Sequence, residues 1–205
     1  VYKQISKLTN RLTKPTLTMK NIIFDFGNVL VGWKPEDFYT RYFNSQSEAR
    51  YFLNEICSPR WRNRIDAGEN QDICIKELCL EHPQYHEAIQ AYKSRWEEMF
   101  PGEIEGMREV VSMVKKHPEY QIYGLTNWSM ETFPQARKRF EILQMIDNYI
   151  VSGNVGLVKP DKRIFELLLK TFDLKATESI FVDDNSDNVA AAKELGFEGI
   201  VFESA

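Results

Sequence analysis

Hydrophobic and polar positions follow two different periods along the second half of the chain. Short apolar runs bounded by turn residues, which are typical of buried strands, occur at 120–127, 148–153, 179–184 and 198–202. Amphipathic segments with helical spacing lie before and between these runs, at 103–117, 161–174 and 186–197. This alternation predicts a parallel sheet with helices on both faces, and residues 21–26 would supply one further strand.

The strand pattern is absent between residues 35 and 99. Three segments there are typical of helices, namely 35–58, 70–82 and 83–100. We therefore predict an α/β fold in which a Rossmann-like parallel-sheet core is interrupted by an inserted α-helical cap. The predicted ranges are 19–34 and 100–205 for the core and 35–99 for the cap, with residues 1–18 as an N-terminal extension.

The extension is basic and rich in hydroxyl side chains, and it contains no acidic residue. It has no apolar segment of the kind that secretory signals require. Two interpretations stay open for it, a mitochondrial-type targeting segment and a solvated arm. Met19 would serve as an alternative start of the protein.

The chain has 205 residues and a net charge of -4, which argues against a general nucleic-acid binder because such a protein needs a basic surface. No apolar run approaches the length that spans a membrane. The cysteines are odd in number and lack paired spacing, so free buried thiols in a reducing compartment are expected at Cys57, Cys74 and Cys79. We therefore expect a cytoplasmic monomer or homodimer whose partner is a small molecule, with no nucleic acid and no membrane.

Polar side chains follow the first four of the predicted strands at their carboxyl ends. Ligands of open parallel sheets bind outside this edge, so the side chains there are candidate functional groups. They are Asp25 after the first strand, Thr126 and Asn127 after the second, Lys159 in the next loop, and the pair Asp183 and Asp184. Each alone has a structural explanation as a cap, turn or surface residue, but the set as a whole suits one anionic substrate.

This combination of groups favours phosphoryl transfer. Clustered carboxylates repel one another unless a cation lies among them, and a ligand set made only of oxygen atoms suits Mg²⁺. The Asp25 carboxylate would attack the phosphorus in line, and Lys159 would balance the remaining charge. Thr126 and Asn127 would donate hydrogen bonds to the phosphoryl oxygens.

Four motifs carry a resemblance to a known family. They occur in the order FDFGNVL, LTN, VKPD and FVDDNSDN, with the helical segments after the first. From residue 19 to about 203 the chain resembles the haloacid dehalogenase-like hydrolase superfamily. Within it, LVGWKPEDFY and LTNWSMETFP look closer to glucose-1-phosphate-type phosphatases and the phosphatase domain of soluble epoxide hydrolases. The resemblance implies a Mg²⁺-dependent hydrolase of small phosphorylated metabolites, with a helical cap inserted after the first motif.

The resemblance also implies roles for individual residues. Asp25 matches the nucleophile that forms an aspartyl-phosphate, and Lys159 matches the lysine of the third motif. Thr126 matches the hydroxyl of the second motif, with Asn127 beside it as a further substrate-binding group. The implied metal ligands are Asp25, the backbone carbonyl of Gly27, Asp184 as the main carboxylate, and Asp183 as a second ligand or as support for it.

The first motif departs from the family pattern at Gly27. The usual pattern, DxDx[TV], has an aspartate there that protonates the leaving group and later activates water, and the loss of such a group costs about 10²–10⁴-fold in rate. An active hydrolase would need a good leaving group, or an acid from the cap or the substrate. The alternatives are a weak or specialised phosphatase, a dehalogenase-type hydrolase, and a catalytically silent phosphometabolite-binding protein. We favour an active hydrolase over a silent protein, because the subfamily that the chain resembles also tolerates glycine at this position. We favour a phosphatase over a dehalogenase, because the dehalogenases of the family need no metal, whereas the pair Asp183 and Asp184 suits a metal ion.

The segment 58–70 is predicted to be a loop of the cap with several candidate substrate-binding side chains. Its charged and aromatic members include Arg60, Trp61, Arg62, Arg64 and Asp66. An arginine there would bind a phosphate or carboxylate with two hydrogen bonds. The alternative is a solvated surface that Trp61 anchors. Trp128 would line the mouth of the site, whereas the remaining aromatic residues are expected to form the interior of the cap and hinge: Trp33, Phe38, Tyr39, Tyr92 and Trp96.

Overall fold

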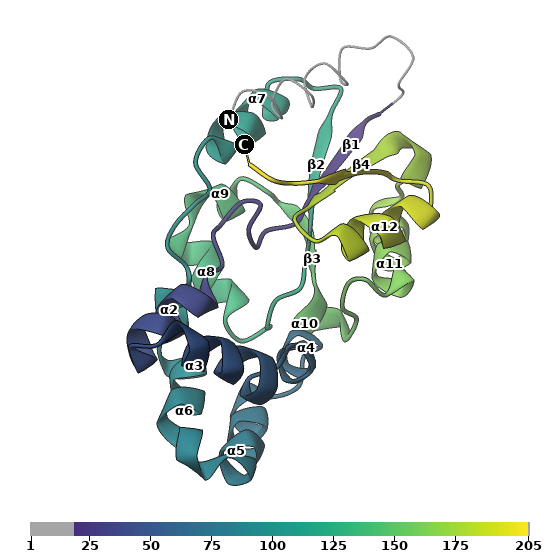
Figure 1. Cartoon of the computed structure of the whole chain (residues 1–205). Coiled ribbons are helices and arrows are strands. Elements are labelled where there is room, and N and C mark those ends of the chain that lie inside the picture. Colours follow the sequence, from purple (N-terminus) through teal and green to yellow (C-terminus); the bar gives the residue numbers. More distant parts are fainter. Residues whose placement is uncertain (1–18, 205) are drawn as a thin grey trace.

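Parallel strands form the sheet on which the rest of the chain is built (Figure 1). The computed structural model describes residues 19–204. In this part of the chain the strands are β1 (Asn21–Phe24), β2 (Gln121–Thr126), β3 (Asn148–Val151), β4 (Ser179–Asp183) and β5 (Glu198–Val201). They lie side by side in the order β3-β2-β1-β4-β5. The predicted α/β fold with a parallel sheet is confirmed.

The register of the central strands brings their carboxyl ends to one edge of the sheet. Phe24, the last residue of β1, lies opposite Gly124 of β2 and Val182 of β4. The next residue, Asp25, donates its backbone N–H to the carbonyl of Val182 at 2.8 Å. Because β2 and β4 end within two residues of this level, the polar residues that follow all three strands emerge close together.

Helices cover both faces of the sheet, and the alternation of side chains along β1 shows why. Ile22 and Phe24 belong to the buried cluster on one face, while Ile23 belongs to the cluster on the other. The first cluster includes side chains of α7 (Met107–Lys115), α8 (Phe133–Arg139) and α9 (Glu141–Gln144). The second includes side chains of α11 (Lys162–Phe172) and α12 (Ser186–Glu194). The sheet is therefore buried on both sides.

A helical insert, residues 35–99, occupies the chain between β1 and α7. Its elements are α2 (Pro35–Phe43), α3 (Gln46–Tyr51), a π-helical turn (Phe52–Ile56), α4 (Pro59–Asp66), α5 (Gln71–Glu81), α6 (His86–Ser94) and the 3-10 turns Pro83–Tyr85 and Trp96–Met99. Aromatic rings fill its interior, where Tyr39 lies 4.5 Å from Phe52 between ring centroids. Figure 1 shows the insert beyond the carboxyl ends of the strands. Its helical character matches the sequence, and its action as a separate cap domain stays a prediction.

The structure differs from the prediction at 58–70, where α4 replaces most of the expected loop. Ser58 caps this helix, because its side chain accepts a hydrogen bond from the backbone N–H of Trp61. Pro59 occupies the first turn, where a backbone donor is not needed. The arginines of this segment are therefore arranged on a helix and not on a loop.

Asparagine residues set two helix boundaries. Residues 35–58 do not form the one helix that was predicted, because Asn44 adopts a φ of 51° and ends α2. The helix predicted at 186–197 begins at its expected first residue, and Asn185 is its N-cap, since the Asn185 side chain accepts the backbone N–H of Asp187. Asparagine suits both positions, because its side chain and backbone readily adopt turn and cap conformations.

The predictions for the extension of residues 1–18 lie outside the described part of the chain. Within residues 19–204, no helix is long and apolar enough to cross a membrane. All three cysteines are free and buried, as predicted: Cys57, Cys74 and Cys79.

Candidate active site

One buried ammonium group joins two of the candidate carboxylates. The Nζ atom of Lys159 lies 2.9 Å from Oδ1 of Asp25 and 2.6 Å from Oδ2 of Asp183. It also donates to the backbone carbonyl of Leu125 at 2.9 Å. Lys159 is 3% exposed and Asp183 is 0% exposed, and charges buried to this degree are tolerated when they are paired. The structure thus brings three of the predicted site residues into direct contact.

Burial controls the protonation of this cluster. Burial raises the pKa of Asp25 to about 7, with the Lys159 ammonium opposing the rise and the Asp183 carboxylate adding to it. Burial also disfavours the charged form of Lys159, but attraction to Asp25 and Asp183 outweighs this effect and raises the Lys159 pKa above its ordinary value. Lys159 therefore stays charged at neutral pH, whereas full ionisation of Asp25 needs more positive charge nearby.

Asp183 is held in one orientation by the start of α12. Its Oδ1 accepts the backbone N–H of Asn185 at 2.8 Å and the Nδ2 of Asn188 at 3.0 Å. The Asn188 amide also lies 3.1 Å from Oδ2. No role was predicted for Asn188, although it lies five residues after the strand-end aspartate, in the first turn of a helix.

Asp184 is more exposed than Asp183 and is positioned by the first motif. Its Oδ2 accepts a hydrogen bond from Nδ2 of Asn28 at 3.1 Å. Asn28 in turn accepts the backbone N–H of Trp33 at 2.9 Å and adopts a φ of 53°, a conformation that asparagine tolerates better than most residues. Asn28 therefore connects the loop after β1 to the loop after β4, which the sequence analysis did not predict.

The three carboxylates form a group that suits a metal ion. Asp25, Asp183 and Asp184 each offer an oxygen, and these oxygens lie within 4.8 Å of one another. An oxygen-only set of this kind suits Mg²⁺. When all are ionised, the carboxylates exceed the single ammonium by two negative charges, which a divalent cation would balance. The residues present therefore fit magnesium, and the Gly27 carbonyl as a further ligand stays a prediction.

Asn127 and Thr126, the two polar residues at the end of β2, differ in what they contact. The Asn127 side chain holds the backbone of Lys159 from both sides, accepting its N–H at 2.8 Å and donating to its carbonyl at 3.0 Å. Thr126 is 1% exposed, yet its Oγ1 has no hydrogen-bond partner among the described residues. A buried hydroxyl without a partner is costly, and a phosphoryl oxygen is a group that would satisfy it. Asn127 thus positions Lys159, while Thr126 is the free candidate ligand group.

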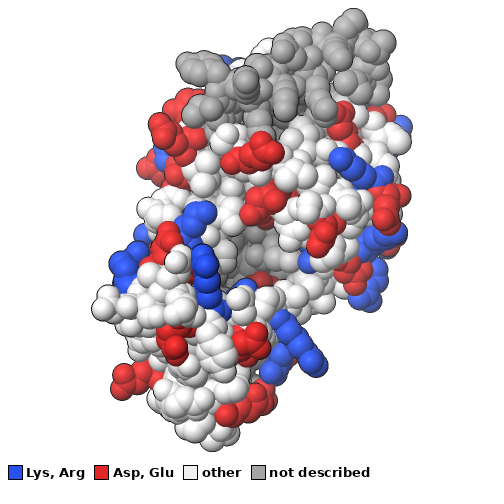
Figure 2. Space-filling model, viewed as in Figure 1, with Lys and Arg blue, Asp and Glu red and all other residues white. Residues whose placement is uncertain are grey.

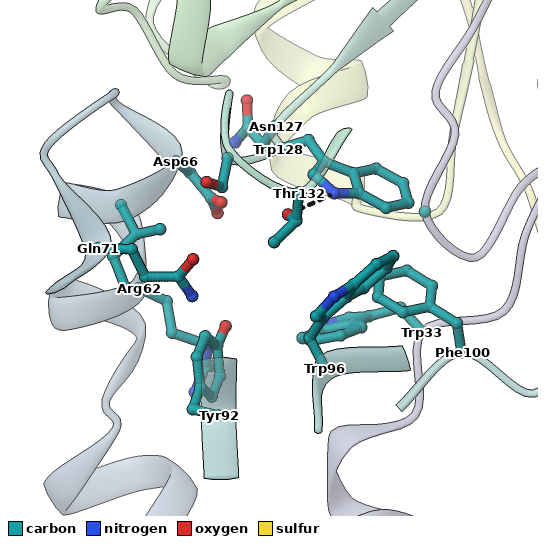
Figure 3. A pocket seen from close by; sticks show the side chains of 13 residues that line it. Trp33, Arg62, Asp66, Gln71, Tyr92, Trp96, Phe100, Asn127, Trp128 and Thr132 are labelled. Carbon is teal, nitrogen blue, oxygen red and sulfur yellow. Dashed lines mark hydrogen bonds between the residues drawn. The ribbon is translucent and has the colours of Figure 1, made fainter. Parts of the chain in front are cut away.

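A cavity of about 120 Å³ lies between the sheet edge and the helical insert (Figure 3). The side chains around it include Arg62, Asp66, Gln71 and Tyr92 of the insert, and Asn127, Trp128 and Thr132 of the sheet side. Gly27 also lines it, and a Cβ atom added at Gly27 would meet no other atom within 4 Å. Figure 2 shows that the surface is also hollowed between the sheet and the insert. The cavity therefore extends over the position where the family pattern has its second aspartate.

The arginines of α4 have different surroundings. Arg62 lines the cavity, but its Nη1 donates to two backbone carbonyls of the insert. Arg64 forms ion pairs with Glu69 and Glu77 at 2.7 and 2.8 Å, and Arg60 is exposed. Of these three, Arg62 is therefore the one that lies at the cavity. Trp61 is buried, as its predicted anchoring role requires.

The aromatic residues divide between interior and cavity. Phe38 and Tyr39 are buried inside the insert, as predicted, and Trp128 lines the cavity, also as predicted. Trp33, Tyr92 and Trp96 belong to the interior, as predicted, since Trp96 is buried and Trp33 and Tyr92 pack against the same hydrophobic cluster, but all three also line the cavity. Trp33 precedes α2, Tyr92 lies on α6 and Trp96 begins the 3-10 turn that follows it. Figure 3 shows Trp33 and Trp96 on one side of the cavity and Tyr92 on the other, near Arg62.

The comparison with known proteins gives the family. Residues 22–202 match the family model described as haloacid dehalogenase-like hydrolase. The chain belongs to this family. The strand-end residues described above lie within the matched region, and the resemblance seen in the four motifs is confirmed.

Two relatives of this chain carry the name phosphatase. The chain is 28% identical to the sesquiterpene phosphatase astK of Aspergillus oryzae, covering 89% of both chains. It is 27% identical to the D-ribitol-5-phosphate phosphatase of Bacteroides thetaiotaomicron, covering 88% of this chain and 90% of that one. It is 24% identical to the drimenol cyclase drtB of Aspergillus calidoustus, covering 90% of this chain but 34% of the relative. Family and relatives class the chain as a hydrolase.

Solved structures share the fold. A HAD family enzyme from Bacteroides thetaiotaomicron, in complex with magnesium and inorganic phosphate, superposes with a TM-score of 0.68 at 16% identity. The match covers 91% of this chain and 95% of that one. A predicted HAD-like family hydrolase from Porphyromonas gingivalis gives the same TM-score at 18% identity, covering 89% of this chain and 90% of the other. At these identities the likeness shows the Rossmann-like fold of the family.

Proposed function

We propose that this chain is a Mg²⁺-dependent phosphatase that hydrolyses small phosphorylated metabolites through an aspartyl-phosphate on Asp25. The observation that carries the proposal is the buried contact of Lys159 with Asp25 and Asp183, with the unpaired hydroxyl of Thr126 at the same sheet edge. These groups supply a nucleophile, a fixed positive charge and a hydrogen-bond donor within one enclosed site. The phosphatase names of two relatives support the same reaction.

Asp25, Asp183 and Asp184 would hold the magnesium ion. Once bound, the ion would neutralise negative charge on the phosphoryl group and on the carboxylates. The fold neighbour from Bacteroides thetaiotaomicron is a complex with magnesium and inorganic phosphate, which supports this assignment. The Gly27 carbonyl is proposed as a further ligand on the basis of the family resemblance alone.

The protein's own groups would act on the phosphoryl group in distinct ways. An Asp25 oxygen attacks the phosphorus, and the bond from phosphorus to the ester oxygen breaks. The Lys159 ammonium compensates the charge of the phosphoryl oxygens, and the Thr126 hydroxyl donates to one of them. Asn127 contributes by holding the backbone of Lys159, which keeps the ammonium in place. Water then hydrolyses the aspartyl-phosphate and restores Asp25.

The cavity sets the expected size and character of the leaving group. Its volume of about 120 Å³ is small beside the ~300–1,000 Å³ of typical ligand pockets, so a large substrate would require the insert to move away from the sheet. Trp33, Trp96 and Trp128 give it aromatic walls, while Arg62 and Gln71 add polar groups. We therefore propose a compact phosphomonoester whose leaving group has some apolar surface, over which the insert closes as a cap that excludes water.

A screen of phosphomonoesters with and without Mg²⁺ tests this function. Phosphate release should require both Mg²⁺ and Asp25, so Asp25→Asn should abolish it. Asp187→Asn is the matched control, because Asp187 is an exposed carboxylate in the first turn of α12, outside the carboxylate cluster. Turnover that survives removal of metal, together with halide release from 2-haloacids, would favour the dehalogenase alternative. Phosphate binding without turnover of any substrate by wild type would favour the silent binding protein.

A further inference from the structure

The proposed reaction lacks a proton donor for the leaving group, because Gly27 has no side chain. In phosphoryl transfer the attacking and leaving oxygens lie roughly in line across the phosphorus. A phosphoryl group attacked by Asp25 and bound by Thr126 must therefore direct its ester oxygen away from Asp25. The open space over Gly27 belongs to the cavity, so the ester oxygen would point toward the cavity and its far wall.

Asp66 supplies the carboxylic acid on that wall. Among the described residues that line the cavity, no other carries a carboxyl group. Arg62 is a fixed cation that donates to backbone carbonyls, and burial raises the pKa of Tyr92 well above its usual range. Figure 3 shows Asp66, Arg62 and Gln71 on one side of the cavity and Trp128 on the opposite side, with Asn127 drawn beside the Asp66 carboxyl group. Asp66 is therefore the cavity residue best able to exchange a proton near neutral pH.

The C-terminal end of α4 is fixed to the residues that follow β3. The hydroxyl of Ser152, directly after β3, donates to the backbone carbonyl of Asp66 at 2.6 Å. Two residues further on, Gly68 approaches Gly153 so closely that a Cβ atom at Gly68 would lie 2.5 Å from the Gly153 carbonyl oxygen. The Gly153 N–H in turn donates to the carbonyl of Trp128 at 3.2 Å. These contacts anchor the backbone of Asp66 beside the ends of β2 and β3.

We infer that Asp66 is the general acid and base of this enzyme, replacing from the helical insert the carboxyl group that Gly27 lacks. The inference rests on the phosphatase function proposed above. It makes the insert part of the catalytic machinery and not only a cover for the substrate.

The surroundings of Asp66 suit this role. Burial raises its pKa to about 7, while the positive charges of Arg62 and Lys159 oppose the rise. Tyr92 of α6 also faces it and stays neutral, because burial raises its own pKa. Asp66 is half-buried, because part of its side chain borders the cavity. The surrounding protein atoms still keep most water away from the carboxyl group, which favours its neutral form. A carboxyl group with a pKa near 7 can both donate and accept a proton at neutral pH.

The two half-reactions then balance. In the first, an Asp25 oxygen bonds to phosphorus, the bond from phosphorus to the ester oxygen breaks, and that oxygen takes the Asp66 proton to leave as an alcohol. In the second, the Asp66 carboxylate removes a proton from water as the water oxygen bonds to phosphorus. The bond from phosphorus to Asp25 breaks, inorganic phosphate is released, and Asp66 is again protonated.

Two substrates that differ in their need for a proton test this role. Benzyl phosphate and 4-nitrophenyl phosphate have similar size, but 4-nitrophenolate leaves readily without a proton, whereas benzyl alkoxide does not. In Asp66→Asn, kcat/KM for benzyl phosphate should fall by about 10²–10⁴-fold, and that for 4-nitrophenyl phosphate by less than about tenfold. Since kcat/KM reports the steps up to formation of the aspartyl-phosphate, slow attack of water does not obscure the comparison. In wild type, kcat/KM for benzyl phosphate divided by kcat/KM for 4-nitrophenyl phosphate should fall as the pH rises through about 7, the pKa of Asp66.

Two further variants separate an acid from a merely structural residue. Gly27→Asp has room for its side chain and needs no positive φ, so adding it to Asp66→Asn should restore much of the benzyl phosphate activity. Glu69→Gln is the matched control, because Glu69 follows α4 closely but is exposed and paired with Arg64. It should change neither substrate's kinetics. Thermal unfolding of each variant checks that the fold persists.

The outcomes distinguish the inference from the function on which it rests. If wild type hydrolyses both substrates but Asp66→Asn lowers both kcat/KM values equally, or lowers neither, Asp66 is not the acid while the phosphatase function stands. An equal loss that Gly27→Asp fails to restore would point to a structural role and overturn the inference in the same way. If wild type hydrolyses no phosphomonoester in the presence of Mg²⁺, the proposed function itself fails, and the role of Asp66 with it.

Discussion

The ammonium of Lys159 lies 2.6 Å from the carboxylate of Asp183, and both side chains are almost completely buried. Removing one member of such a pair leaves an uncompensated charge in the interior. Asp183 also receives hydrogen bonds from Asn185 and Asn188, so its charged form is fixed in place and cannot turn toward solvent. Lys159 is therefore as important to stability as to the proposed catalysis.

Replacement of Lys159 should destabilise the protein as well as inactivate it. We expect Lys159→Met to lower the free energy of unfolding by about 3–5 kcal/mol, because the carboxylates of Asp25 and Asp183 lose their shared cation. Urea unfolding without Mg²⁺ measures this change. The matched control is Lys162→Met, since Lys162 pairs with Glu194 at the surface, where ion pairs contribute at most about 1 kcal/mol. Equal stabilities for the two variants would contradict the interpretation.

Thr126 should show opposite effects on stability and on binding. Its buried hydroxyl has no partner among residues 19–204, so Thr126→Val removes a polar group without breaking a hydrogen bond. We expect the ligand-free variant to be as stable as wild type or up to about 1–2 kcal/mol more stable. Inorganic phosphate should inhibit it less strongly, because a donor to the phosphoryl oxygens is gone. Urea unfolding and the inhibition constant of phosphate measure the two effects, and a loss of stability with unchanged inhibition would refute the assignment.

Magnesium should raise the thermal stability of the protein through the carboxylate cluster. A ligand that binds only the folded state stabilises it by RT ln(1 + [L]/Kd), which is about 2.7 kcal/mol at a concentration of about 100 Kd. We expect Asp184→Asn to lose most of this Mg²⁺-dependent rise in Tm, because Asp184 is one of the three clustered carboxylates. Asp187→Asn, three residues later and exposed, should retain it. A full magnesium response in Asp184→Asn would exclude Asp184 as a ligand.

The sequence predicted the sheet edge well because each residue there follows directly from its strand. Asp25 and Asp183 come at or just after the ends of parallel strands, and parallel strands in register bring such residues together without further information. Lys159 was found through its motif, although its contact with both carboxylates depends on how Asn127 holds its loop. Strand order and local motifs were therefore sufficient for this part of the site.

The far wall of the cavity was predicted only in part, because the sequence indicated the segment 58–70 and allowed for an acid from the cap but assigned that role to no residue. Asp66 reaches the site because α4 ends against Ser152, a residue 86 positions away in the sequence. That contact depends on the packing of the whole insert onto the sheet, which neither periodicity nor motif spacing encodes. For the same reason the sequence could not show that Trp33 and Tyr92 also border the cavity, since an aromatic residue has the same sequence pattern whether it faces a core or a cavity.

Burial of Asp66 gives it a second measurable effect, on stability as a function of pH. Its pKa rises from an ordinary value of 3.8 to about 7 in the folded protein, chiefly because burial disfavours its charge. Between these two values the folded state keeps a proton that the unfolded state has lost. The contribution of Asp66 to the free energy of unfolding is therefore fully present below about pH 4, and it declines as the pH rises toward 7.

Asp66→Asn should remove this decline. Each pKa unit corresponds to about 1.36 kcal/mol, and contact with solvent through the cavity reduces the effect. We therefore expect the free energy of unfolding of Asp66→Asn, relative to wild type, to increase by about 1–2 kcal/mol between pH 5 and pH 8, as measured by urea unfolding. Glu69→Gln should not show this increase, because hydrogen bonding to Arg64 lowers the pKa of Glu69 instead. If the difference in free energy of unfolding between Asp66→Asn and wild type stays constant over this pH range, Asp66 ionises at its ordinary pKa. A carboxyl group with an ordinary pKa is ionised at neutral pH and could not serve as the proton donor.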